Sequence, residues 1–294
     1  MDGDVPAGRP AWTAGQVARH LRIAESTLRS WHRRYGVGPH ASRPGSYRRY
    51  TAVDVARLQR MHDLIESGML PSEAAFTIST PAGPPLHEAL ADVLAAARDL
   101  DSGRCLSALA DSLAARGVVE VWERLCRPAL QAIDADQGAG PDCVDHEHVL
   151  SWSIAAALHR VDRPAADGTG GPLVLLACTE AEQHTLPLEA LGAALAEYRT
   201  AVRMLGAAVP TQTLVHAAAA ARPAAVVLWS QSPATARVEA VRALGAFPLR
   251  RVAAGPGWPR RRLSGTERVT GLAAAVTSLT DPALWDSGAA GGGF

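Results

Sequence analysis

The chain has 294 residues, enough for two or three compact domains, and its 48% hydrophobic and 20% charged residues are ordinary for a globular protein. No apolar run approaches the roughly 20 residues that a helix needs to cross a bilayer, so we expect no membrane-spanning role. The formal net charge is +0, but residues 19–60 contain ten arginines against Glu25 and Asp54. This local basic block indicates a polyanionic partner.

The cysteines and the N-terminus predict a cytoplasmic protein. The N-terminus lacks a charged and then apolar signal segment. No C-x-x-C pair occurs among the four scattered cysteines, which are Cys105, Cys126, Cys143 and Cys178. A reducing compartment fits this usage best.

Residues 12–37 predict two short helices around a turn. Thr13 is suited to cap the first helix, and Glu25 or Ser26 to open the second. The inward faces would be formed by Val17, Ala18, Leu21, Leu28 and Trp31. The outer face of the second helix would carry Thr27, Arg29, Ser30, Arg33 and Arg34. This is a helix-turn-helix pattern, in which the second helix enters the major groove of DNA.

The next segment, 40–50, is too rich in Gly, Pro and Ser for a helix and ends in the letters YRRY. A two-stranded wing rising from its Pro-Gly turn would place Arg43, Tyr47 and Arg48 beside the DNA backbone. Thr51 would then cap a third helix. An arginine-rich helix face can also be merely solvated. The coincidence of charge, helix pair and wing favours DNA binding.

Three motifs in order, TLRSWHRRYG, RRY and TAVDV, resemble the winged helix-turn-helix of the MerR family over about residues 10–78. The resemblance implies that the second helix touches DNA through Thr27, Arg29 and Ser30, and the wing through Arg43, Tyr47 and Arg48. One departure is His32, which stands where the family has an acidic residue.

The proline-rich stretch PAGPP at 81–85 predicts a domain boundary, which gives a DNA-binding domain at 10–80. Apolar residues at helical spacing then predict a four-helix bundle at 86–162. Its fourth helix carries His146, Glu147 and His148, which with Cys143 can be drawn as a metal set. Histidines at i and i+2 point to different sides of a helix, so this spacing is poor for one ion. His148 can equally be a core histidine.

From residue 172 short apolar strands alternate with helices, which predicts a doubly wound parallel α/β sheet at 170–284. The expected strands lie in PLVLLAC, AVRMLG, AAVVLWS and FPLRRVAAGPG, with helices at 188–199, 211–221, 234–244 and 267–280. The loops TEAEQHTLP and AAGPGWP follow two of these strands. Ligands bind at the carboxyl ends of strands in such sheets, so the loops mark the expected site.

The loop TEAEQHTLP, the four-helix bundle and the MerR-like DNA-binding domain together resemble the cobalamin-binding transcriptional regulators of the CarH and LitR type. The resemblance covers essentially the whole chain. The resemblance implies that His184 ligates the cobalt of adenosylcobalamin and that Glu182 orients its imidazole. It also implies that Glu147 and His148 lie near the upper cobalt face. The implied function is a light-sensing DNA-binding regulator, expected to be a repressor, that self-associates on double-stranded operator DNA.

Three positions depart from that family. Gln137 stands where a tryptophan covers the upper axial group, and Pro187 stands where a glycine gives the loop room. Ala253-Ala254 replaces a Gly-Gly pair, which narrows the groove for the nucleotide tail. An alternative therefore stays open, in which the regulator binds no cobalamin and its α/β domain serves oligomerisation, another ligand or a protein antagonist. A corrinoid enzyme is not expected, because no residues remain for a substrate domain, and we predict no catalytic residues.

Overall fold

A computed structural model describes residues 12–39, 49–79, 83–137, 144–162, 172–261 and 263–280, without the side chains of residues 52, 136, 137 and 144. The chain divides into two compact units, one of Met1–Pro81 with Ala273–Phe294 and the other of Ala82–Leu272. Within the described ranges, no helix is both long and apolar enough to cross a membrane.

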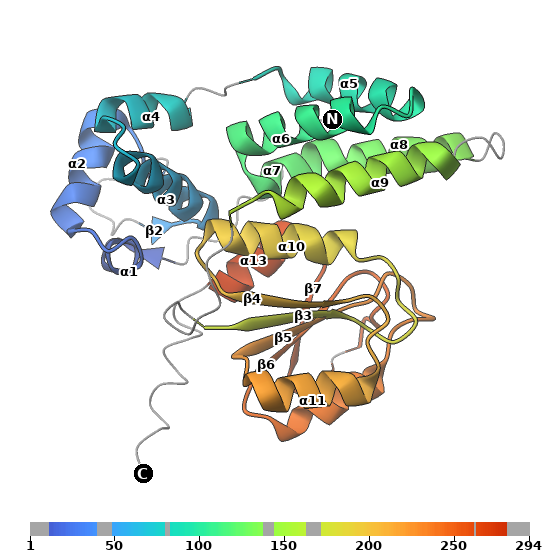
Figure 1. Cartoon of the computed structure of the whole chain (residues 1–294). Helices are drawn as coiled ribbons and strands as arrows, with labels where there is room; N and C mark the ends of the chain where they lie inside the picture. Colours follow the sequence, from blue (N-terminus) through green and yellow to red (C-terminus); the bar gives the residue numbers. More distant parts are fainter. Residues whose placement is uncertain are drawn as a thin grey trace, which may run out of the picture. The chain divides into compact units, whose positions relative to one another are not determined.

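The first unit begins with the helix-turn-helix that the sequence predicts. Its elements are β1 (Trp12–Thr13), α1 (Ala14–His20), α2 (Glu25–Tyr35), β2 (Arg49–Tyr50), α3 (Ala52–Glu66) and α4 (Pro71–Ser79) (Figure 1). Strand β1 pairs antiparallel with β2, which the sequence did not predict. The proposed wing residues at 40–48 lie outside the described residues. The last described helix of the chain is α13 (Leu272–Thr280).

Two capping boxes set the starts of α1 and α3. Thr13 Oγ1 accepts the Gln16 N–H at 3.2 Å, and Gln16 Oε1 accepts the Thr13 N–H at 2.8 Å. Thr51 and Asp54 repeat this arrangement at 3.1 and 2.8 Å. Each box satisfies donors that a helix start leaves unpaired. The helices then close over a core made of Val17, Leu21, Leu28, Trp31, Tyr50, Val55, Leu58 and Met61.

The second unit begins with the predicted helical bundle. Its helices are α5 (Leu86–Arg98), α6 (Ser102–Arg116), α7 (Val118–Val121), α8 (Arg127–Gln137) and α9 (Val144–His159), with a π-helical turn, η1 (Trp122–Cys126), joining α7 to α8. Helix α6 packs against α5 and α9. The core holds the apolar residues at helical spacing, among them Ala89, Val93, Leu109, Leu125, Ile133, Leu150 and Ile154.

A five-stranded parallel sheet follows the bundle, in the order β4-β3-β5-β6-β7. Its strands are β3 (Val174–Cys178), β4 (Val202–Gly206), β5 (Ala225–Trp229), β6 (Arg250–Ala254) and β7 (Thr266–Val269). Helix α10 (Leu186–Glu197) covers one face, and α11 (Thr211–Ala221) and α12 (Val238–Ala243) cover the other, with a short η3 turn (Leu244–Ala246) after α12 (Figure 1). The predicted fold class, with an N-terminal helix-turn-helix, a bundle and a parallel sheet, is confirmed.

The last part of the predicted pattern is wrong in two respects. Residues 267–269, which the sequence places in a final helix at 267–280, belong to the edge strand β7 (Thr266–Val269) beside β6. Three of its four residues are polar, and Glu267 and Arg268 are exposed, because the strand has a partner on one side only. Helix α12 is also shorter than predicted, since it begins at Val238 rather than 234.

Polar contacts join the bundle to the α/β domain within the second unit. Helix α10 packs against α7 and α9. Glu197 near its end accepts the Val118 N–H at 2.9 Å, which pairs one of the open donors at the start of α7. His159 at the end of α9 contacts Glu189 of α10, with Nε2 and Oε2 2.8 Å apart. The end of α9 is therefore fixed beside the first half of α10.

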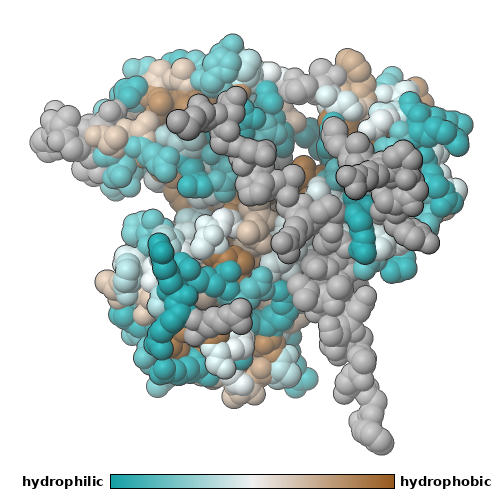
Figure 2. All heavy atoms as spheres, turned by 180° about the vertical axis from the view of Figure 1, so that it is seen from behind, coloured by the Kyte–Doolittle hydropathy of each residue, from teal (hydrophilic) through white to brown (hydrophobic). Residues whose placement is uncertain are grey.

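Among the described residues on the face shown in Figure 2, hydrophilic side chains surround separate hydrophobic patches. Of the large hydrophobic side chains, Leu70, Phe76 and Trp152 are among those most exposed. Trp152 lies on α9, and its exposed fraction is 58%.

Candidate functional site

The predicted DNA-contacting face lies on α2. Arg29, Arg33 and Arg34 are exposed, and Thr27 and Ser30 are half-buried on the same helix, while Leu28 and Trp31 point into the core. Arg29 makes an ionic contact with Glu25, one turn earlier on the same helix, at 3.4 Å. An exposed pair of this kind is weak and leaves the guanidinium available to phosphates. Arg43, Tyr47 and Arg48 lie outside the described residues.

The predicted upper-face residues are on or next to α9. Glu147 and His148 lie in its first two turns and both are exposed, so His148 is not a core histidine. Gln137 is the last residue of α8, and its side chain is not among the described ones. Cys143 lies outside the described residues. Within the described part of the chain, no group of three His, Cys, Asp or Glu residues is placed to hold a metal ion.

The loop after β3 is held tightly at the carboxyl edge of the sheet. The Thr179 N–H donates to the Trp229 carbonyl at 3.0 Å, and the Glu182 N–H donates to the Thr179 carbonyl at 2.9 Å. Between them Ala181 has a positive φ of 68°. The carbonyl of Glu182 accepts the Ala208 N–H at 2.8 Å. These bonds aim the Glu182 side chain under the loop and leave His184 above it.

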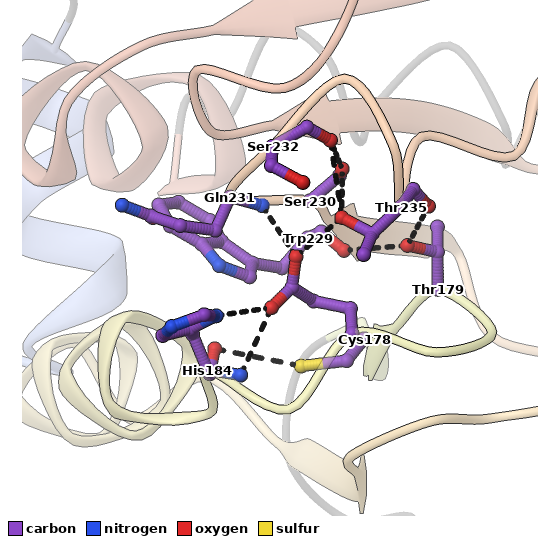
Figure 3. A network of polar contacts seen from close by, with 9 residues as sticks. Cys178, Thr179, His184, Trp229, Ser230, Gln231, Ser232 and Thr235 are labelled. Atoms are coloured by element: carbon purple, nitrogen blue, oxygen red, sulfur yellow. Dashed lines mark hydrogen bonds and ion pairs between the residues drawn. The ribbon is translucent and has the colours of Figure 1, made fainter.

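Glu182 is the centre of a polar network, and its side chain is 1% exposed. One carboxylate oxygen accepts the backbone N–H of His184 at 3.0 Å and faces the imidazole Nδ1 at 2.5 Å. The other accepts the Gln231 N–H at 2.7 Å and the Thr235 hydroxyl at 2.5 Å. Figure 3 shows these contacts converging from the loops after β3 and β5. All four contacts place a donor on the carboxylate, so the network suits its ionised form.

The charge of Glu182 follows from the balance of burial and hydrogen bonding. Burial alone raises the pKa of its carboxyl, but the bonds from Thr235, from the backbone of His184 and Gln231 and from the imidazole outweigh it and lower the pKa to about 2. The carboxylate is therefore ionised at neutral pH, and it fixes the proton of the imidazole on Nδ1.

The other ring nitrogen of His184 is then a lone-pair donor that faces away from the network. The side chain is 67% exposed. Nε2 makes no hydrogen bond to any residue in the described ranges. A neutral imidazole with Nδ1–H on a carboxylate and Nε2 open is the arrangement that metal-binding histidines use. The structure thus brings together the predicted pair Glu182 and His184.

The thiol beside this pair is not a second ligand. Burial, followed by the charges of Glu182 and Glu189, raises the pKa of Cys178 to about 12, so the thiol stays protonated. Its Sγ donates to the His184 carbonyl at 3.6 Å. Cys178 therefore supports the loop by packing and by one weak bond.

Pro187 does not disturb the loop. It occupies the first turn of α10, where a missing N–H is harmless because that donor has no partner inside the helix. Ala253 and Ala254, at the end of β6, are 1% and 3% exposed and are packed into the domain.

Sequence reasoning missed the residues that complete the network. Thr235 donates to Glu182, and its hydroxyl lies 2.9 Å from that of Ser230, while the Thr179 hydroxyl donates to the Thr235 carbonyl at 2.7 Å. These hydroxyls belong to loops about fifty positions apart in the chain. The run of Ser and Thr after AAVVLW, at a strand's carboxyl end, was the available signal.

Known proteins similar to this chain include one family of regulators and two repressors. The family of MerR HTH regulatory proteins matches residues 12–77. The HTH-type transcriptional repressor CarA of Myxococcus xanthus is 32% identical over 243 residues, 79% of this chain and 83% of CarA. The repressor CarH of the same organism is 32% identical over 214 residues, 67% of this chain and 71% of CarH.

A solved structure gives the same picture for the fold. The monomethylamine corrinoid protein of Methanosarcina barkeri superposes with a TM-score of 0.52 at 12% identity, over 68% of this chain and 100% of that protein. Identity this low shows a common fold alone. The MerR match and the two repressors establish that this chain belongs to the HTH-type transcriptional repressors represented by CarA and CarH, and that it is a DNA-binding regulator of transcription.

Proposed function

We propose that the chain represses transcription by binding operator DNA through the exposed face of α2 and the wing. The residues assigned to this contact are Thr27, Arg29, Ser30, Arg33 and Arg34 on α2, with Arg43, Tyr47 and Arg48 on the wing. Guanidinium groups on an exposed recognition helix can reach both phosphates and the acceptors of guanine. The support is the exposure of the three α2 arginines above a core that fixes the helix.

Replacing Arg29 with alanine is expected to weaken operator binding by about 1–3 kcal/mol, since one base or phosphate contact is lost. Gel-shift titrations at a fixed salt concentration measure this. Arg124→Ala, which removes an exposed arginine from the bundle, is the matched control and should leave the affinity unchanged. Equal affinities for wild type and Arg29→Ala would remove Arg29 from the DNA surface.

We further propose that the α/β domain senses a cobalt corrinoid bound to His184. The observation that carries this is the open Nε2 of His184, with Nδ1 held by the buried and ionised Glu182. Imidazole is a good ligand for cobalt, and the carboxylate raises its basicity and fixes its direction. The residues on the imidazole side of the site therefore fit the group.

The position of α9 supports a ligand between the bundle and the α/β domain. His148, Trp152 and His159 fall on one face of this helix, because they are four and seven positions apart. His159 contacts Glu189 of α10, and α10 begins two residues after His184. The face that carries the exposed His148 and Trp152 is thus the one whose last turn contacts α10 through His159. We assign Glu147, His148 and the Gln137 position to the upper side of the ligand.

Adenosylcobalamin, when bound, would supply a cobalt–carbon bond that light breaks, and so a light signal. The protein's part is to hold the lower side with His184 and to cover the upper side from α9. Gln137 is smaller and more polar than tryptophan, so it would cover an adenosyl group poorly and admit water. We therefore expect weaker retention of the adenosyl form and better tolerance of methyl or hydroxo groups above the cobalt.

The test is the visible absorption spectrum of the full chain after incubation with adenosylcobalamin or hydroxocobalamin in the dark and desalting. We expect a retained corrinoid spectrum for wild type and a loss of retention or a shifted spectrum for His184→Ala. The matched control is His216→Ala, which removes an exposed imidazole on α11. An unaltered spectrum in His184→Ala would leave the ligand in place but remove His184 as its cobalt partner.

A second function is favoured by the close packing at the end of β6. If no cobalamin is retained in light or dark, the α/β domain acts in oligomerisation, in binding another ligand or in docking a protein antagonist. With or without cobalamin, we expect a homo-oligomer on operator DNA, because a helix-turn-helix commonly reads paired half-sites. Light scattering with and without hydroxocobalamin separates a ligand-dependent oligomer from a constitutive one.

A further inference from the structure

Trp229, the last residue of β5, lies at the carboxyl edge of the sheet beside the His184 network. The inference rests on the cobalt site proposed above. We propose that the indole of Trp229 narrows the passage that the nucleotide tail of a complete cobalamin would need, so that the site binds a cobalt corrinoid without this tail more tightly than a complete cobalamin. The packing of the strand ends around His184 carries the proposal.

The passage is defined by the chemistry of the ligand. The nucleotide tail of cobalamin hangs from the lower face of the corrin ring, which is the face that an imidazole ligand occupies. With His184 below the cobalt, the tail has to descend into the α/β domain beside His184. It can pass only where the loops after the strands leave a gap.

The side of His184 toward β4 is closed by backbone. The Ala208 N–H donates to the Glu182 carbonyl at 2.8 Å, and the Val209 N–H donates to the Cys178 carbonyl at 3.3 Å. These bonds tie the loop after β4 directly to the loop that carries His184. Opening this side would break backbone hydrogen bonds in a buried region, which is costly.

The side toward β6 is also closed, by glycines packed on the loop after β5. A methyl group on Gly255 would overlap the Ser230 carbonyl oxygen and lie 3.1 Å from two carbons of the Trp229 ring. A methyl group on Gly257 would overlap the Ser232 carbonyl oxygen and lie 2.5 Å from the Ser230 hydroxyl. No space remains between the ends of β5 and β6 at these positions.

The Trp229 side chain lies between these two closed sides, at the end of β5. It pairs in register with Cys178 of β3 and Ala254 of β6, and Val226 and Leu228 of its own strand point into the core under α11 and α12. Alternation along the strand therefore puts the indole on the α10 face, the face from which His184 rises. Figure 3 shows the indole and the imidazole on the same side of the network. A rotamer change can move this ring, whereas the backbone bonds on either side cannot yield.

No hydrogen bond to a described residue holds the indole ring in place. Its Nε1 is buried without a hydrogen-bond partner among the described residues, and a buried unpaired donor is unfavourable. Replacing the ring by a methyl group therefore breaks no hydrogen bond of the side chain. Trp229→Ala should open space on the α10 face without disturbing the bond between Thr179 and the Trp229 carbonyl.

The experiment measures the affinity of the full chain for hydroxocobalamin and for aquacobinamide, which has the same ring without the nucleotide. Wild type, Trp229→Ala and Trp229→Leu are titrated in the dark by visible absorption, with circular dichroism as a check of folding. We expect wild type to prefer aquacobinamide. Trp229→Ala should gain about tenfold or more in affinity for hydroxocobalamin and change little for aquacobinamide, because the space serves the tail alone. Trp229→Leu keeps apolar bulk and should resemble wild type.

In free cobalamin the base of the nucleotide tail can bind the cobalt itself, which changes the affinity measured for the protein. This effect is the same for every variant, so it cancels when the affinities of the variants are compared. If Trp229→Ala changes both affinities alike, or if wild type binds hydroxocobalamin as tightly as aquacobinamide, selection by Trp229 is wrong and the cobalt site stands. If neither corrinoid binds wild type or either variant, the cobalt site itself is wrong.

Discussion

Replacing Trp31 with alanine is expected to unfold the DNA-binding head and abolish operator binding, while the unit at Ala82–Leu272 stays folded. Trp31 is 6% exposed on the inner face of α2, and its ring lies 6.4 Å from that of His62 on α3. Removing a buried aromatic side chain costs about 3–5 kcal/mol. A domain this small has little more stability than that to lose.

Thermal unfolding followed by circular dichroism should show the early loss of one transition in Trp31→Ala, and gel shifts should show no specific complex. Trp152→Ala is the control, since it removes an exposed tryptophan from the bundle and should leave DNA affinity unchanged. Wild-type operator binding by Trp31→Ala at 25 °C would mean that Trp31 does not hold the recognition helix in place.

Much of the element order could be predicted because each element carries a local signal. Thr13 and Thr51 each precede a helix and are followed three residues later by a side chain that can accept a hydrogen bond. Both capping boxes can therefore be recognised from the sequence. The strand β3 is buried along its whole length, and its run of apolar residues predicts this burial. Such signals depend only on near neighbours in the chain.

The elements that escaped prediction depend on distant neighbours. Strand β7 is only four residues long and carries Glu267 and Arg268 on its exposed edge, so it lacks the apolar run of an inner strand. It exists because β6 offers an open edge for pairing. The pairing of β1 with β2 is of the same kind, since it joins segments separated by the first two helices.

The candidate site could be predicted only where its residues are near one another in the chain. Glu182 and His184 are two positions apart, so their pairing can be read from the sequence. Gln231 and Thr235 lie 49 and 53 positions beyond Glu182 and reach it only because β5 lies beside β3. Trp229 looks like the final apolar residue of a buried strand. Its place beside His184 follows from packing against Gly255, which no local pattern reveals.

Glu182→Gln is expected to weaken both the fold at the strand ends and any binding at His184. The carboxylate accepts four hydrogen bonds, and an amide would direct N–H groups at some of these donors. Leaving buried donors unpaired costs about 1–3 kcal/mol each. Loss of the partner that orients the imidazole should lower corrinoid affinity about 10- to 100-fold. Titration with aquacobinamide measures that loss, and Glu180→Gln, an exposed change in the same loop, is the control.

The same variant should also change how stability depends on pH. Because the pKa of Glu182 is lowered from 4.5 to about 2 on folding, the unfolded chain binds the extra proton between these values. Wild-type stability from this group is complete above pH 4.5 and is lost as the pH falls toward 2, by roughly 3 kcal/mol in all. Urea unfolding of wild type, Glu180→Gln and Glu182→Gln from pH 7 to pH 2 measures it. The other carboxylates contribute alike to all three, so only Glu182→Gln should show a shallower fall in this window. Parallel profiles for wild type and Glu182→Gln would mean that the carboxylate is not held ionised by the network, and the fixed Nδ1 proton of His184 would lose its support.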